Sequence, residues 1–389
     1  MASGPTESVV VTGVGLVSAL GNDALTTWQR LLANESAIAL RQPFLELSPG
    51  PLAMISKAPV AVKALVETTV LAALADAQLS SPLPHCGVVV GSSRSHQGEW
   101  EALARQRSRQ AERVDPPPNN PTFWLGTLPH QIALRAAQQV GSRGPVLAPM
   151  AACATGIWAL AQGVELIRSG QCDRVIAGAV EAPITPLTLA GFAKMGAQAQ
   201  TGCYPFDQSR EGLVLGEGAA VMVLERATLA IQRGVPIYGE IRGFGLLNDA
   251  HHITSPAVDT AISAVRQCLQ RSQLTPADVD FIHAHGTATQ RNDQMEAAIA
   301  ATVFPKNIAI TATKGATGHT LGASGAMGTV FSLLALRHQQ LPPCVGLKTP
   351  AFDLNFVRQT TAARLKHAIC CSFGFGGQNT GVALSEAVS

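Results

Sequence analysis

Short apolar runs rich in β-branched residues alternate with longer stretches of helical periodicity, and this order predicts an α/β protein. We expect buried strands over residues 9–15, 87–92, 146–148, 174–179, 219–224, 237–244, 279–282, 308–310, 368–371 and 380–384. Helices are expected over 26–32, 62–77, 258–272, 294–301 and 325–336, and a further helical pattern begins at Ile157. Residues 41–60 are proline-rich and typical of a loop. Because both parts of the chain repeat strand, polar connection and apolar helix, we predict two similar halves packed together.

The composition indicates a large interior and a partly covered surface. Of the 389 residues, 47% are hydrophobic and only 14% are charged, so we expect another subunit to cover part of the surface. The 28 Lys and Arg nearly balance the 26 Asp and Glu, which gives no charge for binding nucleic acid. The charge-free stretches 145–163 and 315–336 are long enough to span a bilayer, but their small residues favour buried helices of a soluble core instead.

The cysteine and glycine spacings exclude several classes of site. None of the eight cysteines forms a C-x-x-C pair and no signal peptide is evident, which argues against a disulfide scaffold or a zinc site and favours a reducing cytoplasm. The early glycines Gly13, Gly15 and Gly21 lack the spacing of a dinucleotide-binding loop.

One cysteine lies where a nucleophile is expected. The run 146–148 leads into a tight turn of small residues that carries Cys153, and a helix follows directly. Backbone N–H groups and the positive end of the helix dipole favour a thiolate at this place. The alternative is a buried structural cysteine that packs as a small hydrophobe.

Two histidines follow later strands in the same way. His285 lies in the run His-Ala-His-Gly-Thr-Ala-Thr after the strand at 279–282, and His319 follows the strand at 308–310 within the glycine-rich run that starts at Lys314. Strand exits of this kind border the crevice of an open α/β sheet. A cysteine and two histidines placed there indicate covalent acyl chemistry, although each histidine alone is more often structural.

Four motifs in order resemble those of β-ketoacyl-acyl-carrier-protein synthases of the elongating, decarboxylative type, which have the thiolase fold. They are Ala152-Cys153-Ala154-Thr155-Gly156, Pro205-Phe206-Asp207 with Gly216-Glu217-Gly218, His285-Gly286-Thr287-Ala288-Thr289, and residues 314–325. The resemblance implies a five-layered αβαβα core made of two thiolase-like halves. The half at 1–235 would carry the nucleophilic cysteine, and the half at 236–389 would carry both histidines.

The resemblance also implies the roles of single residues. Cys153 matches the nucleophile, and His285 and His319 match the histidines that assist decarboxylation of a malonyl thioester. The backbone N–H groups of Cys153 and Phe375 match an oxyanion hole, and Phe375, with Phe373 beside it, matches a gating loop. The remaining matches are Lys314 as an active-site lysine, Thr287 and Thr289 as contacts of the phosphopantetheine arm, Asp293 and Glu296 as supporting acids, and Trp100 as a large ring near the acyl tunnel.

Departures from the family pattern affect the surroundings of this site. Asn292 replaces the usual glycine before the acid, Gly328 stands where the family usually has a glutamate, and Gly315 and Gln378 also replace more usual residues. The loss of the glutamate predicts a rewired network around Lys314. We therefore expect a condensing enzyme outside housekeeping fatty-acid synthesis, although both fatty-acid and polyketide or specialised-lipid pathways stay open.

Three other functions compete with this interpretation. A chain-length-factor-like partner subunit usually lacks the cysteine that is present here. A thiolase acting on coenzyme A esters would carry a second cysteine in a C-terminal C-x-G motif, and a modular polyketide synthase would carry fused domains. The resemblance implies an acyl carrier protein as partner, a homodimer or a heterodimer with a related subunit, and neither metal nor other cofactor.

Overall fold

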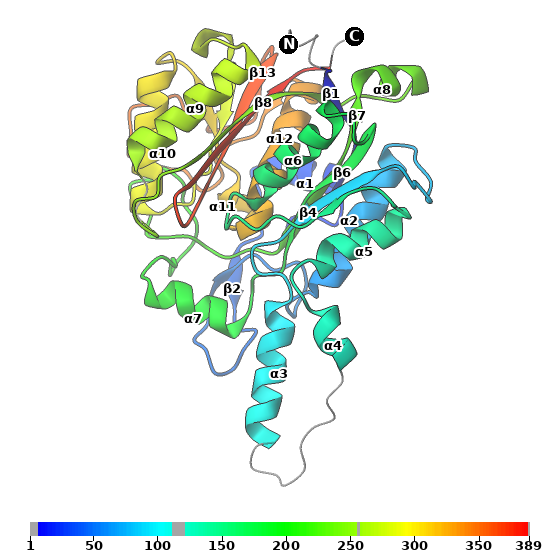
Figure 1. Ribbon diagram of the computed structural model, residues 1–389. Coiled ribbons are helices and arrows are strands. Elements are labelled where there is room, and N and C mark those ends of the chain that lie inside the picture. Colours follow the sequence, from blue (N-terminus) through cyan, green and yellow to red (C-terminus); the bar gives the residue numbers. More distant parts are fainter. Residues whose placement is uncertain (1–6, 111–120, 255–256, 388–389) are drawn as a thin grey trace.

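The structure is a computed structural model that describes residues 7–110, 121–254 and 257–387. The strands of its main sheet are β1 (Val9–Ser18), β4 (Gly87–Gly91), β5 (Val146–Leu147), β6 (Arg174–Glu181), β7 (Gly218–Arg226), β8 (Gly239–Asn248), β9 (Phe281–His283), β10 (Ala309–Thr311), β13 (His367–Gly374) and β14 (Gln378–Ser385). Hydrogen bonds join these ten strands in the order β10-β9-β13-β14-β8-β1-β7-β6-β4-β5 (Figure 1).

The two ends of this sheet repeat one arrangement. On one side β1 pairs antiparallel with β7, β7 antiparallel with β6, and parallel strands β4 and β5 follow. On the other side β8 pairs antiparallel with β14, β14 antiparallel with β13, and parallel strands β9 and β10 follow. Within the main sheet, the two units are joined by the pairing of Val9–Val11 with Gly239–Ile241. The domain boundary proposed after residue 235 lies between α8 (Ala227–Arg233) and β8, and it stays a prediction.

Helices make three further layers around these two units. Helices α6 (Thr155–Arg168) and α12 (Ser324–His338) pack against each other in the middle, where α6 contacts β4 and β6 and α12 contacts β13. The outer layers are α2 (Val62–Asp76) and α5 (Gln131–Val140) on one side, and α9 (Val258–Ser272) and α10 (Gln290–Val303) on the other. The predicted αβαβα order and thiolase-like fold are confirmed.

The central helices approach each other very closely. A Cβ atom on Gly156 of α6 would lie 2.4 Å from the backbone nitrogen of Ala326 in α12, so only glycine fits there. Residues 324–336 of α12 are buried all round, which explains the charge-free sequence of this helix. Within the described ranges, no helix has the length and apolar character needed to cross a membrane.

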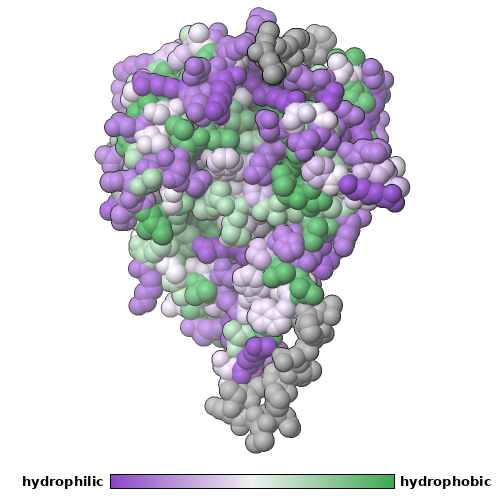
Figure 2. Space-filling model, in the orientation of Figure 1, coloured by the Kyte–Doolittle hydropathy of each residue, from purple (hydrophilic) through white to green (hydrophobic). Residues whose placement is uncertain are grey.

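The remaining elements lie around this core. They are α1 (Ala24–Leu32), β2 (Ala39–Arg41), β3 (Gly50–Leu52), α3 (Gln97–Gln110), α4 (Pro121–Gly126), α7 (Pro186–Lys194), α11 (Lys314–Thr317), β11 (Gln340–Leu341), β12 (Thr361–Ala362), and 3-10 turns at Pro276–Asp278 and Leu321–Ala323. Helices α3 and α4 project from the body of the molecule (Figure 1). Figure 2 shows a mostly hydrophilic upper surface on this face and apolar patches across its middle.

Two predicted features differ from the structure. The segment 41–60 is not all loop, because β3 lies within it and pairs with β2. The strand before Cys153 is not buried: β5 is the last strand of the sheet, and Leu147 is 38% exposed. Apolar strands at a sheet edge have the same local pattern as central ones, so the sequence alone could not place this strand.

Candidate active site

A strained turn presents Cys153 at the start of α6. Ala152, the residue before it, has a φ of +47°, a conformation that a β-carbon disfavours. The Thr155 hydroxyl holds the turn, since it accepts from the Ala151 N–H at 2.9 Å and donates to the Ala152 carbonyl at 2.7 Å. The sulfur is thereby fixed at the strand-to-helix turn, with only 8% of the residue exposed.

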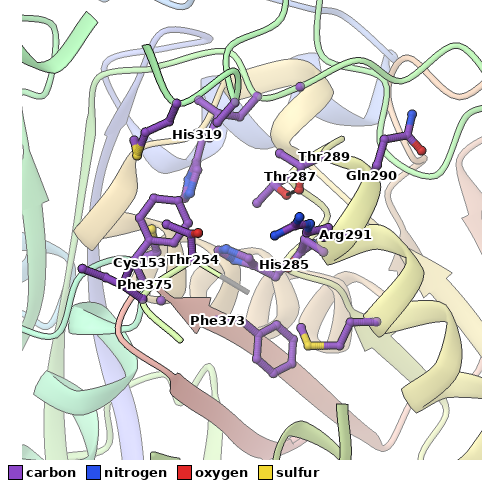
Figure 3. Close-up of a pocket in the computed structure, with 18 of the residues that line it drawn as sticks. Cys153, Thr254, His285, Thr287, Thr289, Gln290, Arg291, His319, Phe373 and Phe375 are labelled. Atoms are coloured by element: carbon purple, nitrogen blue, oxygen red, sulfur yellow. Dashed lines mark hydrogen bonds between the residues drawn. The ribbon is translucent and has the colours of Figure 1, made fainter. Parts of the chain in front are cut away.

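Cys153, His285 and His319 come together from three separate segments of the chain. The sulfur and one ring nitrogen of each histidine all lie within 4.8 Å of one another. The two imidazole rings are 5.1 Å apart and nearly perpendicular. Figure 3 shows Cys153 and His319 on one side of a cavity, with Thr287, Thr289 and Arg291 on the opposite side.

The environment of Cys153 does not favour a thiolate, which corrects the expectation from the helix dipole. Burial raises the pKa of the thiol to about 11, and the positive charge of Lys314 opposes this only in part. Burial, followed by the same lysine charge, holds the pKa of both His285 and His319 well below the ordinary value. The resting site therefore holds a neutral thiol beside two neutral imidazoles, and a base is required before the sulfur can attack.

Lys314 fixes the orientation of the first histidine. Its Nζ lies 3.2 Å from His285 Nδ1 and also donates to the His285 carbonyl oxygen. Because an ammonium group only donates, His285 Nδ1 accepts and the ring proton is assigned to Nε2. His285 is therefore prepared to donate a hydrogen bond from Nε2.

Two buried carboxylates hold the backbone that carries His285. Glu296 accepts from the N–H groups of His285 and Gly286, both at 2.6 Å. Asp293 accepts from the Phe206 N–H at 2.7 Å, and the Asn292 side-chain amide donates to both acids. Burial raises the pKa of Asp293 to about 6 and that of Glu296 to about 7. Asn292, one of the departures from the family pattern, thus bridges the two acids.

The space beside Gly328 is filled by His283. A Cβ at position 328 would lie 2.9 Å from the His283 ring and 2.9 Å from the Cys370 sulfur. The His283 Nε2 is 3.2 Å from the Thr313 hydroxyl. No ion pair found among the described residues includes Lys314. A neutral ring thus occupies the region beside position 328, where the family pattern predicts a carboxylate.

The other two departures also have local explanations. A Cβ on Gly315 would lie 1.8 Å from the Val345 carbonyl oxygen, so the backbone approach requires glycine. Gln378 accepts a hydrogen bond from the Trp158 indole N–H at 3.1 Å.

The three residues open on a cavity of about 470 Å³. Its lining includes Phe192, Met195, Thr287, Thr289, Gln290, Arg291, Phe373 and Phe375, as well as the cluster itself. Trp100 is not among the described residues that line it, and its indole N–H is buried without a partner. The Trp100 ring, which the resemblance places near the acyl tunnel, thus does not line this cavity.

The Phe375 loop lies over the nucleophile. A Cβ on Gly374 would be 3.1 Å from the Cys153 backbone nitrogen, so the two backbones that the oxyanion prediction requires are adjacent. The Phe375 ring is 37% exposed and 6.2 Å from the Phe192 ring. Gly376, with a φ of +80°, donates to the Ile253 carbonyl at 2.8 Å. The oxyanion and gating roles stay predictions.

Sequence reasoning did not single out several residues of this site. Ser324, whose hydroxyl is 2.9 Å from His319 Nδ1, is one of them, and His283 and Phe192 are others. The available signal for Ser324 was a hydroxyl residue five positions after a candidate histidine, inside the run 314–325.

Comparisons with known proteins agree with this geometry. Two family descriptions match, "Beta-ketoacyl synthase, N-terminal domain" over residues 55–230 and "Beta-ketoacyl synthase, C-terminal domain" over residues 238–348. The chain is 33% identical to the mitochondrial 3-oxoacyl-acyl-carrier-protein synthase of Arabidopsis thaliana, over 95% of this chain and 91% of that protein. It is also 33% identical to 3-oxoacyl-acyl-carrier-protein synthase 2 of Rhizobium meliloti, over 97% of this chain and 98% of that protein.

Solved structures share the same fold over nearly the full chain. One is a complex of a type II polyketide synthase acyl-carrier protein with its ketosynthase bound to the hexaketide; it has a TM-score of 0.91 and 26% identity, covering 98% of this chain and 100% of that chain. Another is the ishigamide ketosynthase/chain length factor, with a TM-score of 0.91 and 25% identity, covering 99% of this chain and 100% of that chain. Sequence and fold point to the same group of proteins.

Proposed function

The chain belongs to the β-ketoacyl synthase family, and we propose that it catalyses decarboxylative Claisen condensation. An acyl group held on Cys153 reacts with malonyl-acyl-carrier protein to give 3-oxoacyl-acyl-carrier protein. The observation that carries this proposal is the cluster of Cys153, His285 and His319 at the cavity wall.

The first half-reaction loads the enzyme. The Cys153 sulfur attacks the thioester carbonyl of the acyl donor, and its proton passes to a neighbouring imidazole. The developing oxyanion is met by the backbone N–H groups of Cys153 and Phe375. When the intermediate collapses, the phosphopantetheine sulfur departs and takes the proton from the imidazole, which leaves an acyl-Cys153 thioester.

The second half-reaction forms the carbon–carbon bond. Malonyl thioester loses carbon dioxide, and the electron pair of the broken bond forms an enolate. His285 donates its Nε2 proton as a hydrogen bond to the enolate oxygen, and His319 lies beside the same position. The enolate carbon then attacks the acyl-Cys153 carbonyl, and the cysteine sulfur leaves as the thiolate, which takes up one proton from water.

The remaining site residues support these steps. Lys314 orients His285, and Glu296 and Asp293 hold the backbone around it. Thr287 and Thr289 offer hydroxyls at the cavity wall to the amide groups of a phosphopantetheine arm. This arm belongs to the substrate, and the reaction changes no oxidation state that would call for a redox cofactor or a metal.

An acyl carrier protein and a second ketosynthase-like subunit are the proposed partners. The complex of a ketosynthase with its acyl-carrier protein supports the first. The edge strand β5 supports the second, because Leu147 is 38% and the nearby Met150 55% exposed beside a strand with one free edge. We place the reaction in the cytoplasm, in keeping with eight free cysteines.

Intact mass spectrometry tests the proposal. Wild type, Cys153→Ala and the control Cys172→Ala are incubated with acyl-carrier-protein thioesters of several chain lengths, and malonyl-carrier protein is then added. We expect an acyl adduct on wild type and on Cys172→Ala but not on Cys153→Ala, followed by release of a 3-oxoacyl product. Absence of any adduct on wild type would refute the condensing function and favour a chain-length-factor-like partner subunit.

A further inference from the structure

A buried chain of hydroxyl groups ends on His319. The Ser324 hydroxyl, at the first residue of α12, lies 2.9 Å from His319 Nδ1. The Thr320 hydroxyl lies 3.2 Å from that of Ser324 and donates to the Met327 sulfur at 3.3 Å. All four residues are at most 8% exposed, so the contacts are shielded from water.

The two catalytic histidines therefore have different kinds of partner. Lys314 beside His285 only donates, which leaves His285 with its proton on Nε2. A hydroxyl beside His319 donates or accepts. The Met327 sulfur only accepts. The ring N–H and both hydroxyl hydrogens therefore all find an acceptor when His319 Nδ1–H donates to Ser324, Ser324 donates to Thr320, and Thr320 donates to Met327.

We propose that Ser324 is a positioning residue that makes His319 the general base for Cys153. With the ring proton held on Nδ1 by Ser324, the Nε2 lone pair is free toward the cavity and the thiol. The inference rests on the proposed function: in the loading step His319 accepts the thiol proton, while His285 remains a hydrogen-bond donor.

The proton balance of the loading step follows. Nε2 of His319 takes the proton from Sγ, the sulfur–acyl bond forms, and the imidazolium is stabilised by its Nδ1–H bond to the Ser324 oxygen. The carrier's thioester bond breaks, and its sulfur leaves with the proton from Nε2. Burial raises the pKa of the thiol to about 11 and lowers that of His319, so the proton transfer is uphill and depends on the stabilisation of the imidazolium by Ser324.

The same hydroxyls also satisfy the opposite tautomer. If both rotate, Thr320 donates to Ser324 and Ser324 donates to Nδ1, with the ring proton on Nε2. His319 then offers a hydrogen bond to the enolate during decarboxylation. A backbone N–H at the place of Ser324 would permit only this second state, so the hydroxyl is what lets one histidine serve both half-reactions.

Alkylation of Cys153 by iodoacetamide, followed by peptide mass against pH, tests the inference. The variants are Ser324→Ala, Thr320→Val and the control Ser332→Ala, which removes a buried hydroxyl of the same helix that donates to the Gly328 carbonyl at 2.8 Å. At pH 7 we expect Ser324→Ala to slow alkylation about 10- to 100-fold, the cost of a lost hydrogen bond to a charged group. Thr320→Val should slow it less, Ser324→Thr should restore the rate, and Ser332→Ala should leave it unchanged.

The pH profile separates this role from a general structural effect. As the pH rises toward 10, direct ionisation of the thiol should narrow the difference between Ser324→Ala and wild type. An unchanged rate at pH 7 in Ser324→Ala, or a slowing that persists equally at pH 10, would overturn the inference. Iodoacetamide requires no carrier protein, so the alkylation result is valid whether or not wild type accepts an acyl group. Failure of the proposed function would instead be seen as a missing acyl adduct in the mass spectrometry assay above.

Discussion

Replacing Gly328 by alanine should destabilise the protein, although the same change at Gly191 should stabilise it. Both glycines lie inside helices, where alanine is favoured by up to about 1 kcal/mol. A Cβ at position 191 meets no atom within 4 Å, whereas at position 328 it would lie 2.9 Å from the His283 ring. That ring is tied to Thr313 and lies 6.2 Å from the Phe331 ring, so it has little room to move.

The size of the difference follows from two terms. Overpacking of a tight core costs about 1–3 kcal/mol, which exceeds the gain in helix propensity. Since both variants gain the same helix propensity, we expect Gly328→Ala to be less stable than Gly191→Ala by about 1–3 kcal/mol, and less stable than wild type. Urea unfolding followed by circular dichroism, with ligand-free protein at one fixed concentration, measures both free energies of unfolding.

A double-mutant cycle identifies the colliding group. If the His283 ring is responsible, Gly328→Ala should cost clearly less in a His283→Ala background than in wild type, with a coupling of about 1 kcal/mol or more. If Gly328→Ala is as stable as wild type, the steric argument is wrong. An equal cost in both backgrounds would refute the role of His283 and assign the collision to the Cys370 sulfur, which is also 2.9 Å from the added Cβ.

Two further predictions concern the ionisation of buried groups. Burial raises the pKa of Asp293 to about 6 and that of Glu296 to about 7, so both are largely ionised at pH 8 and largely protonated at pH 5. Because the Asn292 amide stabilises the ionised forms, Asn292→Ala should lose about 1–2 kcal/mol more stability at pH 8 than at pH 5 in urea unfolding; an equal loss at both values would contradict this. Since burial holds the pKa values of His285 and His319 well below the ordinary value, nitrogen NMR should show both rings neutral at pH 6; a titration midpoint near 6.5 would contradict this effect of burial.

The local pattern of the chain was sufficient to predict most elements and the reactive cluster. The helix 258–272 has the predicted bounds, and Cys153, His285 and His319 follow strands or turns as expected. Such features depend on neighbours in sequence, which periodicity and small-residue turns record.

Features that depend on distant neighbours were not predictable in this way. The exposure of Leu147 follows from the edge position of β5, which only the completed strand order determines. The dipole argument for a Cys153 thiolate considered one turn of helix and omitted the burial of the sulfur by side chains that are distant in the sequence. Trp100 was placed by resemblance near the acyl tunnel, yet its ring is not part of the cavity lining.

The close contact of α6 and α12 has a consequence for biosynthesis. The Ser372 hydroxyl donates to the Cys153 carbonyl across 219 positions of sequence, and Gly156 touches Ala326 at the helix crossing. A nascent chain that has emerged only through its first sheet unit holds the nucleophile but neither histidine. Such long-range contacts form late in folding. A growing polypeptide is thus unable to capture acyl groups before its C-terminal segment has docked. The protein becomes active only when folding is complete.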